Sequence, residues 1–133
     1  SSRGGQTTLS MDIAGAYPAA AGVERWTRTL TFDGRKLNLR EDYQLSTRKD
    51  TTSLSLITPR KVHLEKGAVL LGDAGDDGLR IDYDPRVFRV ELEAKPLSDP
   101  SLLRSWPEGL TRIRLIQLSG SLKGSYQLVF QPL

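Results

Sequence analysis

The feature that most constrains the fold of this chain is an alternation of apolar and polar side chains with a period of two, in short runs separated by turn residues. In residues 26–32, the even-numbered positions include Trp26, Leu30 and Phe32, and the three odd-numbered positions are all threonine. Successive side chains of a strand point to opposite faces, so this pattern is typical of a β-strand with one buried face and one solvated face. Helical spacing is nearly absent, and an all-β fold is expected.

The alternation recurs at the spacing expected of an antiparallel β-sandwich of about ten strands. No fixed repeat indicates a propeller or a solenoid. The expected strands are residues 7–13, 26–32, 37–45, 54–56, 62–64, 68–71, 79–83, 88–93, 110–118 and 122–130.

Several connections can also be predicted. Asp33-Gly34 is a hairpin turn between two of the strands, and Asp84-Pro85 is expected to close a second hairpin between 79–83 and 88–93. Glu41 interrupts an apolar file and is expected to mark a strand end or a bulge. Residues 14–22 are expected to form an irregular loop, and 95–107 the longest connection, with a short helical turn at 101–104.

Composition narrows the classes of function. The 133 residues suit one domain, with 38% hydrophobic and 26% charged residues. The absence of cysteine excludes disulfides, thiolate catalysis and Fe–S clusters, and no cofactor is expected. The net charge of +3 is interspersed, which does not indicate nucleic-acid binding but is compatible with an anionic polysaccharide. No run approaches the ~20 apolar residues of a membrane span.

Three sequence patterns carry a resemblance to a known family. The first is residues 11–14 (MDIA), followed by 16–18 (AYP) and 22–28 (GVERWTR); the second is 37–45 (LNLREDYQL); the third is 109–115 (GLTRIRL). In this order they resemble the C-terminal β region of heparinase II/III-type polysaccharide lyases. Together they span most of the chain.

The resemblance implies a β-sandwich that follows an α/α toroid in a bacterial enzyme cleaving uronic-acid polysaccharides by β-elimination. The length suits a single domain over residues 1–133, and the start without methionine is expected of a fragment of a larger protein. The resemblance implies that this fragment is the C-terminal one. The expected partners are the other domains of that protein and an anionic polysaccharide, and the expected location is periplasmic or extracellular. No catalytic or metal-binding residue of the family can be carried over to this chain, so we expect the chain alone not to be an enzyme.

Aromatic and arginine side chains are the candidates for carbohydrate binding. Aromatic rings stack on pyranose faces, and arginine binds carboxylates or sulfates bidentately. The candidate residues are Trp26, Arg28, Trp106, Arg112 and Arg114. The alternative is that Trp26 belongs to the core and that the arginines of residues 110–118 cover a solvated sheet face.

Other chemistry-bearing residues have simpler interpretations. His63, the single histidine, is expected to be a solvated strand residue. Tyr43, Tyr83 and Tyr126 lie on apolar files and are expected in the core, whereas Tyr17 lies in a loop. The acidic, glycine-rich residues 72–78 could bind Ca²⁺ but lack the EF-hand spacing, and a plain connection is favoured.

Two further hypotheses stay open at this point. An independent carbohydrate-binding module would need an exposed Trp or Tyr platform. A cell-surface interaction domain would need an unpaired edge strand.

Overall fold

The computed structural model describes residues 1–47, 51–73, 75, 77–118 and 120–133. Within this part of the chain there are eleven strands and three short helical segments. The strands are β1 (Ser2–Arg3), β2 (Gln6–Asp12), β3 (Val23–Phe32), β4 (Leu37–Leu45), β5 (Ser53–Thr58), β6 (Val62–Glu65), β7 (Ala68–Leu71), β8 (Leu79–Asp82), β9 (Phe88–Lys95), β10 (Leu110–Gln117) and β11 (Lys123–Pro132). The helical segments are η1 (Ala14–Ala16), η2 (Ala19–Ala21) and α1 (Pro100–Ser105).

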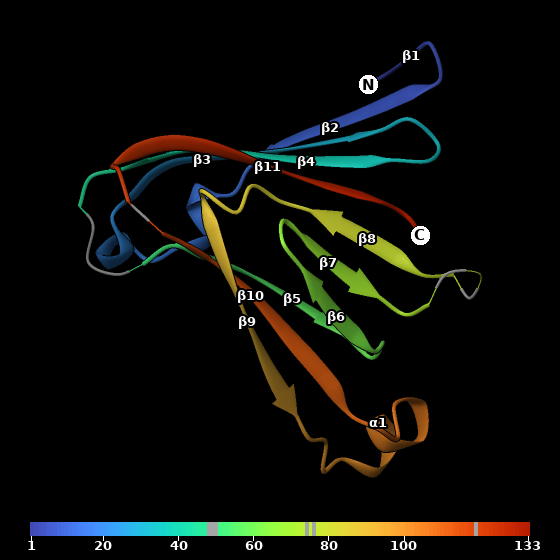
Figure 1. Ribbon diagram of the computed structural model, residues 1–133. Coiled ribbons are helices and arrows are strands. Elements are labelled where there is room, and N and C mark those ends of the chain that lie inside the picture. The colour runs from blue at the N-terminus through green and yellow to red at the C-terminus, as the bar shows by residue number, and fades with distance from the viewer. Residues whose placement is uncertain (48–50, 74, 76, 119) are drawn as a thin grey trace.

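The strands form two sheets of unequal size (Figure 1). The large sheet has eight strands in the order β1-β2-β3-β4-β11-β8-β7-β6, and the small sheet has three in the order β5-β10-β9. The strand pairs in the described ranges are all antiparallel. The prediction of an antiparallel β-sandwich of about ten strands is confirmed.

The connections of the N-terminal half follow the local sequence. Asp33 Oδ1 accepts hydrogen bonds from the backbone N–H groups of Arg35 (2.9 Å) and Lys36 (2.7 Å), which closes the predicted turn between β3 and β4. Gly34 occupies the left-handed region there, with φ 94°. Residues 14–22, expected as an irregular loop, contain the two 3-10 turns η1 and η2.

The second predicted hairpin is wrong. β8 pairs with β7 and β11 in the large sheet, whereas β9 pairs with β10 in the small sheet. The Asp84 carbonyl accepts hydrogen bonds from the backbone N–H groups of Val87 and Phe88, both at 3.0 Å, and this turn takes the chain from one layer to the other. The last two strands, β10 and β11, are also consecutive in the chain but lie in different sheets. Alternation shows which side chains are buried but does not identify the neighbouring strand.

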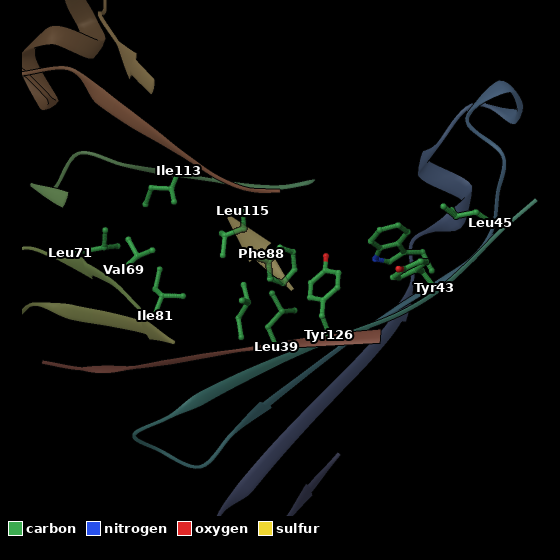
Figure 2. Packing of buried hydrophobic residues seen from close by; sticks show 12 residues of the cluster. Leu39, Tyr43, Leu45, Val69, Leu71, Ile81, Phe88, Ile113, Leu115 and Tyr126 are labelled. Atoms are coloured by element: carbon green, nitrogen blue, oxygen red, sulfur yellow. The ribbon is translucent and has the colours of Figure 1, made fainter. Parts of the chain in front are cut away.

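The core lies where the two sheets face each other (Figure 2). Ile113 and Leu115 of the small sheet point toward Val69, Leu71 and Ile81 of the large sheet (Figure 2). All five are buried, and Leu39, Phe88 and Leu128 extend the same cluster. Burial of these side chains from both sheets is the main stabilising contribution that joins the layers.

The small sheet covers only part of the large one. β2 and the β3–β4 hairpin extend beyond it in Figure 1. On the inward-facing side of these strands Leu9 is 54% exposed and Phe32 is 45% exposed. The register pairs Leu9 with Leu30 and Phe32 with Leu37, so these four residues form one apolar patch, here termed the uncovered strip.

The long connection between β9 and β10 contains the predicted helical turn. α1 spans Pro100–Ser105, and the Asp99 side chain accepts hydrogen bonds from the backbone N–H groups of Ser101 and Leu102. Asp at the N-cap and Pro in the first turn are the local reasons that a helix begins here.

Candidate functional site

A row of polar side chains crosses the apolar face of the large sheet. The β3–β4 register places Arg28 opposite Glu41, and the β4–β11 register places Tyr126 on the other side of Glu41. The neighbouring rows on this face are apolar, with Leu30, Leu39 and Leu128 on one side. The large sheet therefore carries the charged pair Arg28–Glu41 on the face that points toward the small sheet.

Glu41 is the centre of this row and is fully buried. Its Oε2 accepts a hydrogen bond from Trp26 Nε1 at 2.8 Å, and its Oε1 accepts one from Arg28 Nε at 2.7 Å. Arg28 Nη2 also lies 2.6 Å from Glu41 Oε1, with the arginine side chain 30% exposed. Partial burial lowers the pKa of the Arg28 guanidinium, but the hydrogen bond and the charge of Glu41 outweigh it, so the net pKa is raised.

The prediction that Glu41 marks a strand end or a bulge is wrong. Glu41 lies in the middle of β4, and the irregularity lies in β3, between Val23 and Arg25. A buried carboxylate is tolerated here because each of its oxygens has a partner. A signal for this was present in the sequence: Arg28 breaks the apolar file of β3, and counting back from the Asp33-Gly34 turn pairs it with Glu41.

Aromatic side chains cover one end of the polar row. Trp26 stacks on Tyr43, with ring centroids 5.1 Å apart and an interplanar angle of 23°. Gln117 Nε2 of the small sheet donates to the Tyr43 hydroxyl at 3.2 Å, so Tyr43 links the two layers. Tyr17, from the η1–η2 segment, contacts Trp26 with ring centroids 6.1 Å apart. These contacts hold the indole in one position.

The predictions for the tyrosines are largely confirmed. Tyr43 and Tyr126 are buried, Tyr83 is half-buried against the core, and Tyr17 is 43% exposed. Burial, and next the charge of Glu41, raise the pKa of the Tyr126 phenol well above its usual value. Tyr126 therefore stays neutral at ordinary pH.

A cavity of about 340 Å³ opens beside Tyr17 and Trp26. Aliphatic side chains from η2, β3 and β4 line part of it. Four hydroxyl-bearing residues complete the wall: Thr47, Thr51, Thr52 and Ser53. We call this cavity the aromatic pocket.

The five predicted carbohydrate-binding residues do not form one surface. Trp26 and Arg28 lie together on β3, where Trp26 is buried and Arg28 is paired with Glu41. Arg112 and Arg114 lie on the outward face of the small sheet, on the opposite side of β10 from Ile113 and Leu115. Trp106 is exposed and follows α1, which lies away from β3 (Figure 1).

The two arginines on β10 are balanced by carboxylates of β9. Arg112 Nη1 lies 3.6 Å from Glu93, and Arg114 Nη1 lies 3.5 Å from Glu91. Arg112 also donates to the Ser55 hydroxyl. This arrangement agrees with the alternative that these arginines cover a solvated sheet face.

The remaining candidates are isolated. His63 is exposed on β6, as predicted. Part of residues 72–78, at 74 and 76, lies outside the described residues, and in the described part of the chain no three metal-ligating side chains come together. None of the helices described is both long enough and apolar enough to cross a membrane. β9 forms one edge of the small sheet, so the edge strand required of an interaction domain is present.

Comparisons with known proteins add no relative. No family model matches the sequence, and no curated protein matches it. The likeness to heparinase II/III-type lyases therefore depends on the three sequence patterns alone.

Proposed function

We propose that this chain is a non-catalytic β-sandwich domain of a heparinase II/III-like polysaccharide lyase. In this proposal it packs against the other domains of the parent protein, stabilises them and borders the substrate cleft, in the periplasm or outside the cell. The single observation that carries the packing role is the uncovered strip on the large sheet.

The uncovered strip suits contact with another domain. Leu9 and Phe32 face the same side of the large sheet as the core, and both are about half exposed in the described part of the chain. Large apolar side chains that are contiguous on an exposed surface commonly mark an interface. Covering the remaining half of each side chain would contribute roughly 1 kcal/mol per residue to the association.

The arrangement of the polar groups supports the absence of catalysis. β-Elimination needs a base for the proton next to the carboxylate and a cation that neutralises that carboxylate. Arg28 is committed to Glu41, and Tyr126 is held neutral by burial. His63 lies on β6, at the edge of the large sheet opposite to β1–β2.

An activity assay tests the catalytic part of the proposal. The purified chain is incubated with heparin, heparan sulfate and alginate, and the absorbance of unsaturated uronate is followed. No increase over the blank is expected. Formation of product that scales with protein concentration would overturn the proposal.

A second experiment tests the packing role in the full-length parent protein. The double variant Leu9→Ser/Phe32→Ser is compared with Leu64→Ser, whose residue is similarly exposed on the distant strand β6. We expect the double variant to lower the thermal midpoint of the parent, with little change in the isolated domain, and Leu64→Ser to leave both unchanged. Equal midpoints for the parent and its double variant would refute the packing role.

A further inference from the structure

The aromatic pocket has the dimensions of a small-ligand site. Its volume of about 340 Å³ lies near the lower end of the range of ligand pockets, roughly 300–1,000 Å³. It lies where η2, the start of β3, the end of β4 and the start of β5 meet. A ligand the size of one sugar ring is appropriate to this volume.

One wall of the pocket is rigid and aromatic. Trp26 is held by its stack on Tyr43 and by its hydrogen bond to Glu41, so its position does not depend on a ligand. Tyr17 adds a second ring, and this residue is 43% exposed. A preorganised aromatic wall lowers the ordering cost of binding, and an exposed ring offers its face to the C–H groups of a pyranose.

Another part of the pocket wall is formed by hydroxyl-bearing residues. The hydroxyls of Thr47, Thr51, Thr52 and Ser53 can each donate and accept, which matches the hydroxyls of a sugar. Arg28 is not among the lining residues.

We infer that the aromatic pocket binds one pyranose ring of a glycan, packed against Tyr17 and hydrogen-bonded by the threonine and serine hydroxyls. This site is separate from the outward face of the small sheet, where Arg112 and Arg114 lie. It does not depend on the support role proposed above, since a domain without enzymatic activity can hold one unit of a glycan.

The test is a titration of the isotope-labelled chain, followed by ¹H–¹⁵N spectra. The neutral probes are cellohexaose, mannohexaose and N-acetylated chitohexaose, and the acidic probes are a heparin hexasaccharide and an oligoguluronate. We expect saturable shifts with at least one of these probes, concentrated at residues 17–26 and 51–53. No saturable shift with any probe, or shifts confined to Arg112, Arg114 and their neighbours, would overturn the inference.

Variants of Tyr17 then test the role of the ring. Tyr17→Ala is expected to weaken binding about tenfold, and Tyr17→Phe to stay within about twofold of the wild type, because stacking uses the ring. Trp106→Ala, at an exposed aromatic residue outside the pocket, is the matched control and should bind normally. Urea unfolding verifies that each variant is folded. Wild-type affinity in a folded Tyr17→Ala variant would overturn the assignment, whereas the lyase assay would be unaffected.

Discussion

At the scale of single residues, the most informative position is Glu41. From the sequence of its own strand, a carboxylate among alternating apolar residues predicts that the strand ends or bulges there. In the structure the carboxylate is buried and shared between Trp26 Nε1 and the Arg28 guanidinium. The hydrogen bond to Glu41 fixes the position of Trp26, which lines the aromatic pocket. A single charged residue in an apolar strand face therefore influences the shape of that pocket.

Removal of Glu41 should be costly. In Glu41→Ala the Trp26 N–H loses its acceptor, and Arg28 loses its counter-charge, although its 30% exposure lets water replace part of the interaction. We expect a loss of about 2–4 kcal/mol in the free energy of unfolding, and a smaller loss for Glu41→Gln. Urea denaturation measures both. The control is Asp42→Asn, at an exposed ion pair with Arg40, which should change stability by less than about 1 kcal/mol. A Glu41→Ala variant as stable as the control would contradict the role of Glu41.

A second residue-scale prediction concerns Gly124. A Cβ atom at this position would lie 2.7 Å from the Tyr43 hydroxyl and 3.0 Å from its Cζ, so the tyrosine ring would have to move. We expect Gly124→Ala to cost about 1–3 kcal/mol and to weaken the Tyr43–Gln117 link between the sheets.

Gly15→Ala is the matched control for Gly124→Ala. A Cβ at Gly15 would meet no atom within 4 Å, so this change should stay within about 0.5 kcal/mol of the wild type. Equal thermal midpoints for the two variants would show that the space around Tyr43 is not restrictive.

At the scale of elements, turns and layers have to be distinguished. The turn at Asp33 returns the chain to the same sheet, whereas the turn at Asp84 passes it to the other sheet. Both begin with an aspartate whose carboxylate accepts from a backbone N–H two residues on. Local turn chemistry was therefore predictable, but the layer to which the next strand belongs was not, because burial against distant strands decides it.

The charged ladder between β9 and β10 leads to a prediction of acid sensitivity. The hydrogen bond from Arg89 lowers the pKa of Glu91, and the hydrogen bond from Lys95 lowers that of Glu93. Asp84 is shifted in the same direction by Arg86. Because these pKa values are lower in the folded state, the unfolded chain binds more protons, and stability is lost as pH falls through the folded-state values, below about pH 4.

Thermal unfolding between pH 7 and pH 2.5 checks this prediction. The midpoint should fall on acidification, and it should fall less in the double variant Glu91→Gln/Glu93→Gln, which no longer has these two carboxylates to protonate. Added salt should reduce the difference, since these groups are exposed to solvent. A thermal midpoint that rises as the pH falls toward 3 would contradict the predicted direction of the pH dependence.

At the scale of the whole molecule, an eight-stranded sheet packs against a three-stranded sheet. The difference in size gives the large sheet a covered and an uncovered region on its inward side. Where the sheets overlap, Ile113 and Leu115 are fully buried. Where they do not, Leu9 and Phe32 are exposed on the same side of the large sheet. The core and the uncovered strip are therefore parts of one apolar face.

Paired truncations on the small sheet test how far the core extends. Leu115 and Leu92 lie on the inward side of neighbouring strands, but Leu115 is fully buried and Leu92 is exposed. We expect Leu115→Ala to cost about 2–5 kcal/mol and Leu92→Ala about 1 kcal/mol or less. Urea unfolding of both variants provides the comparison. Similar losses of unfolding free energy in the two variants would mean that the core between the sheets extends as far as Leu92.

The sequence by itself determined the all-β class, the positions of most strands, the β3–β4 turn and the short helix near residue 101. Each of these depends on side-chain alternation or on a few adjacent residues, which are local properties. The tertiary structure alone decided that β8 and β9 belong to different sheets, that the buried Glu41 binds Arg28 and Trp26, and that Tyr17 and Thr52 line the same pocket. These features depend on contacts between residues far apart in the chain, and the period of two carries no information about which distant strand supplies the contact.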